Sequence, residues 1–313
     1  MQEKGARMIY SDYQFKVPEQ KMVRVITDTD AKNEADDQFA IVQTLLSPKL
    51  DNVGFIGAHF GTQCPNSMER SYHELETLFD KMQFPKENMI FHGAPHALPN
   101  KNTPVDSEGA QLIIREAMKD DPRPLYVTFL GPLTDMASAL LMEPRIASRL
   151  TVIWIGGAPY PDGGSEYNMN NDIVAANVVF RSQVSMWQVP QNVYQTMNVS
   201  LAELEYRVRP CGAIGRYLCD QLDAHAHEPG PANSDFRTGE SWVLGDNPSV
   251  GLILYPHRFD FDWIGAPHVQ ADGCYVPEMP NRPIRVCKNV DCRLILEDMF
   301  AKLALFHQNH PER

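Results

Sequence analysis

Residues 23–37 read VRVITDTDAKNEADD, in which a short apolar run leads directly into a loop rich in carboxylates. The run Val23 to Ile26 predicts a buried strand, and residues 38–46 follow with helical spacing. The stretch between them carries five acids, which are Asp28, Asp30, Glu34, Asp36 and Asp37. A solvated turn before a helix N-terminus explains one or two acids well and five poorly. The pattern therefore favours a bound cation, and oxygen-only ligands suit Ca²⁺ or Mg²⁺ rather than Zn²⁺.

The composition is that of an ordinary globular protein. The chain has 313 residues, of which 43% are hydrophobic and 22% charged. The net charge of −12, with scattered Lys and Arg, argues against a nucleic-acid or anionic-membrane partner. Residues 1–20 mix charged residues and Pro without an apolar core, so we do not expect a secretory signal there, and no apolar run of about 18 residues is present that could span a bilayer. The 6 cysteines form no CxxC pair, so we expect reduced thiols and a cytoplasmic location.

Strand-like and helix-like segments alternate through the first two-thirds of the chain. The expected strands are residues 53–58, 89–91, 125–130, 151–155 and 184–189. The expected helices are residues 67–82, 107–118 (with Ser107 as N-cap), 133–141 and 173–181. This order predicts an α/β fold with a Rossmann-like, mostly parallel open sheet and helices on both faces.

The remainder of the chain is expected to belong to the same unit. From about residue 201 the pattern is mainly helical, with a late strand at residues 282–286 and a closing helix at 291–306. Because no linker or repeat divides the chain, we expect one domain over residues 1–313, with residues 1–20 as an N-terminal extension and 201–313 as its mainly helical C-terminal part. Ligands of open α/β sheets bind at the carboxyl ends of strands, which is where the aspartate loop lies.

Four separated polar blocks carry a resemblance to a known family. After the aspartate loop come LGPLTDMA at residues 130–137, then GGA at 156–158 with SEYN at 165–168 and DIVAA at 172–176, and finally WVLGDNPSV at 242–250. In this order, over about residues 22–255, the chain resembles the inosine–uridine-preferring nucleoside hydrolases. The resemblance implies a nucleoside hydrolase-like fold, one bound Ca²⁺ (or Mg²⁺) and hydrolysis of the N-glycosidic bond of a small nucleoside or related N-riboside. It also implies a homodimer or homotetramer.

The resemblance also implies roles for individual residues. Asp30 corresponds to the metal ligand that activates the attacking water, and Asp37 to the second metal carboxylate. The main-chain carbonyl of Leu130 and the carboxylate of Asp246 complete the metal ligands. The expected contacts to the ribose hydroxyls are Asp36, Glu166, Asn168 and Asp246.

The chain departs from the family pattern in its first loop. Five residues, 31–35, separate Asp30 from the Asp36–Asp37 pair, where three are usual, so the chain resembles a divergent branch with an Asn-Glu-x-Asp-Asp loop. Asn33 and Glu34 are therefore candidate contacts to the sugar or the metal.

The residues that would bind and release the base are less clear from the sequence. Thr62 stands where many members have Asn, and His59 is close by, so both are candidate substrate contacts. Gly245 stands where purine-type members have a His that assists the leaving base. His257 and His268 are candidates for that task by residue type alone. Trp242, Phe236 and Tyr167 are candidates for stacking on a base, although aromatic residues more often belong to the core.

Several alternatives remain open at the level of sequence. Asp246 and Asp172 could each cap a helix, and Glu166 and Asn168 could be ordinary loop residues. Asp28-Thr29-Asp30 after a strand, with Gly245-Asp246, also loosely resembles a haloacid dehalogenase-type phosphatase, which would form an aspartyl-phosphate. A third possibility is a non-catalytic ribose- or nucleoside-binding protein on the same fold.

Overall fold

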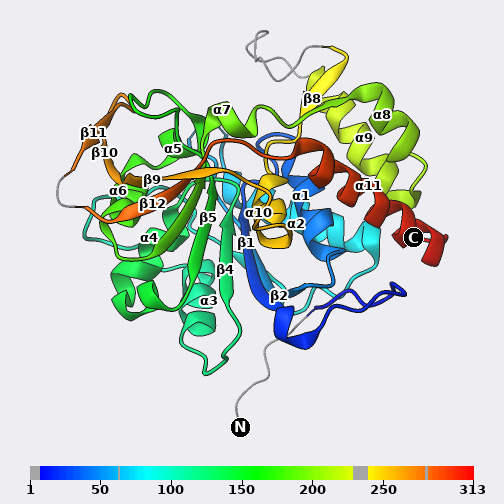
Figure 1. Cartoon of the computed structure of the whole chain (residues 1–313), viewed down its shortest axis with the longest axis horizontal. Coiled ribbons are helices and arrows are strands. Elements are labelled where there is room, and N and C mark those ends of the chain that lie inside the picture. Colours follow the sequence, from blue (N-terminus) through cyan, green and yellow to red (C-terminus); the bar gives the residue numbers. More distant parts are fainter. Residues whose placement is uncertain (1–7, 63, 228–238, 279–280) are drawn as a thin grey trace.

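A mostly parallel sheet forms the centre of the molecule (Figure 1). The computed structural model describes residues 8–62, 64–227, 239–278 and 281–313. Within them, the main sheet has 8 strands in the order β3-β2-β1-β4-β5-β6-β12-β9. Their bounds are β1 Val23–Thr29, β2 Leu50–Gly57, β3 Ile90–His92, β4 Leu125–Phe129, β5 Thr151–Ile155, β6 Ser185–Val189, β12 Pro283–Cys287 and β9 Phe261–Gly265. Neighbouring strands run parallel except for β9, which is antiparallel to β12. The predicted α/β fold is confirmed.

Helices cover both faces of this sheet, as predicted (Figure 1). Helices α3 Glu108–Ala117, α4 Thr134–Met142 and α6 Ile173–Arg181 share one hydrophobic cluster. Helices α1 Asp37–Leu45, α2 Ser67–Met82, α10 Pro248–Leu254 and α11 Cys292–Asn309 share the other. The remaining helices are α5 Tyr167–Asn171, α7 Gln191–Tyr194, α8 Leu201–Arg207, α9 Gly212–Ala226 and two 3₁₀ turns, η1 Glu19–Lys21 and η2 Pro144–Ser148. None of the helices in the described ranges is long and apolar enough to cross a membrane.

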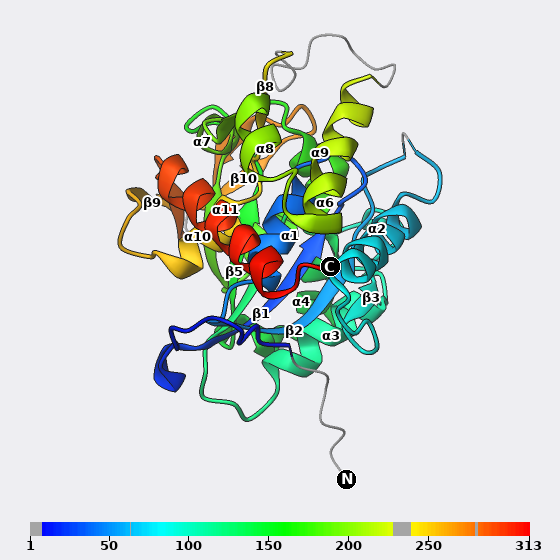
Figure 2. The same cartoon turned by 90° about the vertical axis from the view of Figure 1, so that its right-hand side faces the viewer.

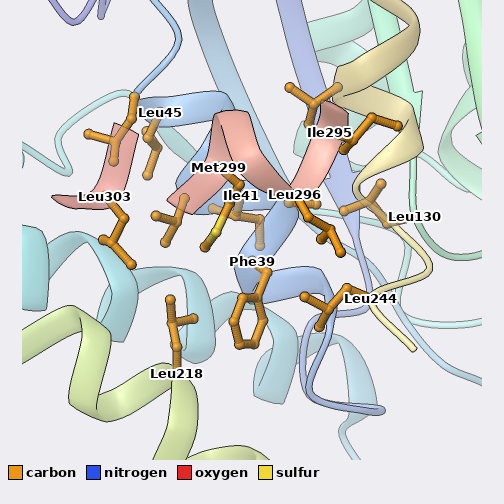
Figure 3. Packing of buried hydrophobic residues seen from close by; sticks show 14 of the residues in the cluster. Phe39, Ile41, Leu45, Leu130, Leu218, Leu244, Ile295, Leu296, Met299 and Leu303 are labelled. Atoms are coloured by element: carbon orange, nitrogen blue, oxygen red, sulfur yellow. The ribbon is translucent and has the colours of Figure 1, made fainter. Parts of the chain in front are cut away.

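Helix α1 is buried along its whole length, which fixes the position of its first residue. All of its residues are buried. Figure 3 shows Phe39 and Ile41 surrounded by Leu296 and Met299 of α11, with Leu218 of α9 nearby. Burying side chains of this size stabilises the fold by about 1.5–3 kcal/mol each. Because α1 cannot shift without disturbing this packing, Asp37 at its N-terminus is held on a rigid element.

The region after residue 201 contains more strand than the sequence suggested. The late strand predicted at residues 282–286 is present as β12, but the prediction of a mainly helical part is incomplete, because β9 also extends the main sheet. Two small antiparallel pairs also form, between β7 Asn198–Ser200 and β8 Ser241–Val243 and between β10 Pro267–Val269 and β11 Tyr275–Pro277. In β9 no residue is fully buried, so its side chains lack the apolar pattern of a core strand. Figure 2 shows α8 and α9 above the α1 side of the sheet, and α9 packs against α2.

The start of the aspartate loop also differs from expectation. Strand β1 continues to Thr29, so Asp28 lies within the sheet and not in the loop. Burial, together with the nearby charge of Asp135, raises the pKa of Asp28 well above its usual value. Asp28 therefore lies near Asp135 of α4, with both carboxyl oxygens unpartnered among the described residues, and is not one of the loop carboxylates.

Candidate functional site

Three buried carboxylates converge beyond the end of β1. Asp36, Asp37 and Asp246 each offer an oxygen atom, and these atoms all lie within 4.8 Å of one another. Asp36 and Asp37 begin α1, and Asp246 lies between β8 and α10. The two segments that the resemblance assigned to one cation are therefore adjacent in space.

Hydrogen bonds from β1 and from the segment before α10 orient this group. The Thr29 hydroxyl donates to Asp37, and the Gly245 amide donates to Asp36 Oδ2 at 2.9 Å. Asp246 is not the cap that the alternative interpretation expected, because Asn247 occupies the N-cap of α10 and no side chain caps that helix. The carboxylate of Asp246 therefore does not cap the N-terminus of α10.

Asp30 lies next to the three carboxylates but outside their closest group. It is 1% exposed, and its Oδ2 has no hydrogen-bond partner among the described residues. A Cβ at Gly131 would lie 2.8 Å from the carboxyl carbon of Asp30, so the glycine is needed for this close approach. An unpaired buried carboxyl oxygen is costly unless a ligand or cation satisfies it.

Burial shifts the pKa values of all four carboxyls upward, and repulsion between neighbouring acids adds to the shift of Asp30, Asp37 and Asp246. Burial, followed by the charge of Asp36, raises the pKa of Asp37 to about 8. Burial raises the pKa of Asp36 to about 6. Burial, with the charges of neighbouring acids, raises the pKa values of Asp30 and Asp246 well above their usual range. Within the described ranges, no Lys or Arg forms an ion pair with any of the four, and their all-oxygen donor set fits a hard divalent cation.

The Leu130 carbonyl and Asn168 meet at the end of β4. Asn168 Nδ2 donates to the carbonyl oxygens of Leu130 at 2.6 Å and Ile155 at 2.9 Å. This amide therefore joins the ends of β4 and β5 in the structure. Metal ligation by Leu130 and ribose binding by Asn168 both stay predictions.

Glu166 is the N-cap of α5, and its carboxylate is occupied by four donors. It accepts from the amides of Gly157 at 2.7 Å, Met169 at 2.9 Å and Asn168 at 3.2 Å, and from the Tyr194 hydroxyl at 2.9 Å. These four hydrogen bonds give Glu166 a structural role in the fold, and its predicted contact to ribose stays a prediction. Asp172 likewise caps α6 through the Ala175 amide, as the capping alternative expected.

The longer loop of residues 31–35 is anchored to two helices. The Ala31 carbonyl accepts from Gln38 Nε2 of α1, and the Ala35 carbonyl accepts from Gln221 Nε2 of α9 at 3.2 Å. The Asn33 amide donates to the Asp30 carbonyl at 2.8 Å. The charge of Glu34 contributes to the raised pKa values of Asp30 and Asp246, after the larger effect of burial. Glu34 therefore lies near the carboxylate group, as a candidate contact should.

A buried acid outside the family motifs also supports this loop. Glu74 of α2 accepts from Gln38 Nε2 at 3.1 Å and from the Tyr217 hydroxyl of α9 at 2.6 Å. Its other oxygen pairs with Lys32 Nζ of the loop at 3.1 Å. The sequence analysis missed Glu74, although a carboxylate beside Leu75 and Leu78 on the apolar face of α2 is a usable signal.

The Glu74 contacts lead to a stability prediction. Tyr217→Phe removes a hydrogen bond to a buried carboxylate and is expected to lower the free energy of unfolding by about 1.5–3 kcal/mol. Urea unfolding of the two proteins measures the difference. Tyr206→Phe is the matched control, because Tyr206 is 83% exposed and should change stability by less than about 0.5 kcal/mol. Equal unfolding midpoints for Tyr217→Phe and the wild type would contradict the importance of this network.

His59 and Thr62 line a pocket of about 570 Å³ together with Glu166 and Tyr167. His59 is buried, with Nε2 at 2.8 Å from Thr134 Oγ1, and its Nδ1 accepts from the Gly61 amide at 3.2 Å. Thr62 is exposed at the rim. Substrate binding by either residue stays a prediction.

The other candidates for contacts to a base are placed as follows. His257 and His268 do not line this pocket. Trp242 is buried in β8, whereas Tyr167 lines the pocket, and Phe236 lies outside the described residues.

Comparison with known proteins finds one matching protein family and several relatives of similar sequence. Residues 25–292 match the protein family described as inosine-uridine preferring nucleoside hydrolase. The chain is 24% identical over 226 residues to the probable uridine nucleosidase 2 of Arabidopsis thaliana, covering 64% of this chain and 69% of that protein. It is 25% identical over 284 residues to the pyrimidine-specific ribonucleoside hydrolase RihA of Salmonella typhimurium strain LT2, covering 82% and 86%.

Solved structures share the fold. A purine-preferring ribonucleoside hydrolase from Gardnerella vaginalis superimposes with a TM-score of 0.74 at 19% identity, covering 91% of this chain and 99% of that one. The plant nucleoside hydrolase PpNRh1 superimposes with a TM-score of 0.72 at 20% identity, covering 90% and 99%.

Proposed function

Because the chain belongs to the inosine-uridine preferring nucleoside hydrolase family and is thus an N-glycosyl hydrolase, we propose that a bound Ca²⁺ assists its hydrolysis of ribonucleosides. Mg²⁺ is the alternative cation. The observation that supports this most is the meeting of Asp36, Asp37 and Asp246, whose oxygens lie within 4.8 Å of one another. Buried carboxylates at this spacing repel one another unless protons or a cation neutralise them.

The residues that would hold the cation are Asp30, Asp37, Asp246 and the main-chain carbonyl of Leu130. When bound, such a cation lowers the pKa of a coordinated water and fixes its position. Asp30 then acts as the general base, accepting the water proton on its Oδ2 atom, which is buried and unpartnered among the described residues. The neighbouring carboxylates stabilise the positive charge that develops on the sugar as the N-glycosidic bond breaks.

The ribose hydroxyls are proposed to contact the residues around this group. Asp36, just before α1, and Asp246, between β8 and α10, supply carboxylate oxygens, and Asn168 of α5 supplies a side-chain amide. Asn33 and Glu34 belong to the loop between β1 and α1. Glu166 supports this role, because its carboxylate accepts a hydrogen bond from the main-chain N–H of Asn168 and so holds that residue in place. His59 and Thr62 lie on the side where the base would lie, in the wall of the pocket.

A nucleoside panel with a chelator tests this function. Purified protein is incubated with uridine, cytidine, inosine and adenosine, and the released reducing sugar is measured with and without EDTA. We expect sugar and free base in equal amounts, loss of turnover with EDTA, and recovery when Ca²⁺ is restored. No turnover across the panel, or turnover unaffected by EDTA, would overturn the proposal.

The alternatives predict other outcomes. A non-catalytic nucleoside-binding protein would show a ligand-induced rise in melting temperature without sugar release. A haloacid dehalogenase-type phosphatase would bind beryllium fluoride at an aspartate, and the family match over residues 25–292 disfavours it. The single-domain organisation, the homodimeric or homotetrameric state and the cytoplasmic location stay predictions.

A further inference from the structure

Cleavage of an N-glycosidic bond leaves a negative charge on the departing base unless a group of the enzyme protonates it. Gly245, beside Asp36, offers no side chain for this task. A Cβ there would lie 3.2 Å from Tyr194 Cδ2 and 3.3 Å from Asp36 Oδ2, so the position leaves little room for one. The proton donor must therefore come from another wall of the site.

None of the four carboxylates lines the pocket of about 570 Å³, but Asn168 connects the two, because it follows the lining residues Glu166 and Tyr167 and its Nδ2 donates to the Leu130 carbonyl at 2.6 Å. The next residue, Gly131, lies against Asp30. The pKa of Tyr167 is raised to about 12, mainly by burial and next by the charge of Asp30. Glu166 lines the same pocket and binds the Tyr194 hydroxyl, whose ring lies beside Gly245. A base attached to a sugar at the carboxylates can therefore extend into this pocket.

Four titratable side chains line the pocket: His59, His96, Glu166 and Tyr167. Glu166 cannot give up a proton, because its carboxylate accepts four hydrogen bonds. Tyr167 has a raised pKa, and its hydroxyl lies 3.4 Å from the Phe60 carbonyl. These two groups are poor acids for a reaction near neutral pH.

His59 is also occupied at both ring nitrogens. The Thr134 hydroxyl donates to Asp172 at 2.8 Å, so His59 Nε2 must donate to Thr134. His59 Nδ1 accepts the Gly61 amide at 3.2 Å. Burial lowers the pKa of His59 to about 4, which is consistent with a neutral ring that shapes the pocket wall.

His96 is the titratable group of the pocket that is still available. It is exposed, and its Nδ1 lies 2.9 Å from the Ala97 carbonyl, so Nδ1 carries a hydrogen and the ring is oriented. Its Nε2 has no hydrogen-bond partner in the ranges that the structure describes. This leaves one ring nitrogen free to face a bound base.

We propose that His96, through Nε2, is the acid that protonates the departing base, an assignment that rests on the proposed function. As the C1′–N bond breaks, its electron pair passes to the base, and protonated His96 gives its Nε2 proton to a base nitrogen. Water forms the new C1′–O bond and loses a proton to Asp30. Asp30 then releases this proton to solvent and His96 takes one up, so that nucleoside and water give sugar and base.

The test compares two leaving groups on the same enzyme. His96→Gln is assayed with the best nucleoside of the panel and with p-nitrophenyl β-D-ribofuranoside, whose p-nitrophenolate leaves without a proton. We expect kcat for the nucleoside to fall about 10²–10⁴-fold and that for the p-nitrophenyl riboside to change less than about threefold. His73→Gln is the control, since the His73 side chain is 68% exposed on α2 and outside the pocket.

The outcomes separate this assignment from the proposed function. An equal loss on both substrates, or no loss on the nucleoside, would overturn the acid role while the hydrolase function stands. A wild-type enzyme that cleaves only the p-nitrophenyl riboside would also overturn it. If the wild type cleaves neither substrate, the proposed function fails and the role of His96 fails with it. Because His96 is exposed, the variant should melt at the wild-type temperature, which excludes a folding defect.

Discussion

Asp37→Asn is expected to lower Ca²⁺ affinity by more than about 100-fold, because even partners one layer beyond a metal's ligands contribute about 10–100-fold. We expect kcat to fall by about 10²–10³-fold or more, as for loss of a group that stabilises developing charge. Asparagine keeps the size of aspartate and can still bond the Thr29 hydroxyl, so α1 should keep its place. Calorimetric titration with Ca²⁺ measures the affinity, and the sugar-release assay measures turnover.

A matched substitution and a second readout make this result specific. Asp80→Asn makes the same chemical change on the surface of α2, where the Asp80 side chain is 63% exposed, and should alter neither quantity. In chelator at pH 8.5, where the wild-type Asp37 is largely ionised, Asp37→Asn should melt at or above the wild-type temperature, because it removes a repelling charge. Wild-type turnover and Ca²⁺ binding in Asp37→Asn would exclude Asp37 from the cation site.

Much of the fold could be predicted because its elements carry strong local signals. The helices at residues 67–82 and 173–181 and the strand at 151–155 have the predicted bounds. In the helices an apolar face combines with clear ends, and the strand is an apolar run buried on both faces. Strand β9 was missed because it lies at the sheet edge, held by main-chain pairing with β12, and has no buried stripe.

The arrangement of the site was harder to predict than the fold, because local sequence patterns do not determine it. The proximity of Asp246 to Asp36 and Asp37 joins distant parts of the chain, and only the resemblance suggested it. Residue type did not show that Glu166 would be saturated by donors, since this depends on the Gly157 amide and Tyr194. The anchoring of the longer loop by Gln221 of α9 could not be predicted either, because no periodic pattern encodes a contact between a loop carbonyl and a distant helix.

Without a divalent cation, the protein is expected to lose stability as the pH rises from about 4 to about 8. The folded-state pKa values of Asp36, about 6, and Asp37, about 8, lie above the usual value of 3.8. Through these two groups the folded protein binds more protons than the unfolded chain in this window, so their contribution to the free energy of unfolding falls with increasing pH. His59, whose pKa is lowered to about 4, acts in the opposite direction below about pH 6.5, so the comparison of pH 6 with pH 8 reports mainly on the aspartates. The contribution of these two groups is fully present below about pH 4 and is lost as the pH passes their raised values.

Calcium should reverse this trend, because it binds the ionised carboxylates and binding must release the protons they hold. Thermal unfolding in EDTA and in saturating Ca²⁺ at pH 6 and pH 8 tests this, and the Ca²⁺-induced rise in melting temperature should be larger at pH 8. At 100 times its Kd the cation stabilises the fold by about 2.7 kcal/mol. Asp37→Asn should flatten the EDTA profile between pH 6 and pH 8, while Asp80→Asn should not. A cation-free protein that gains stability from pH 6 to pH 8 would show that these carboxylates do not share one buried site, since separated and solvated acids would already be ionised at pH 6.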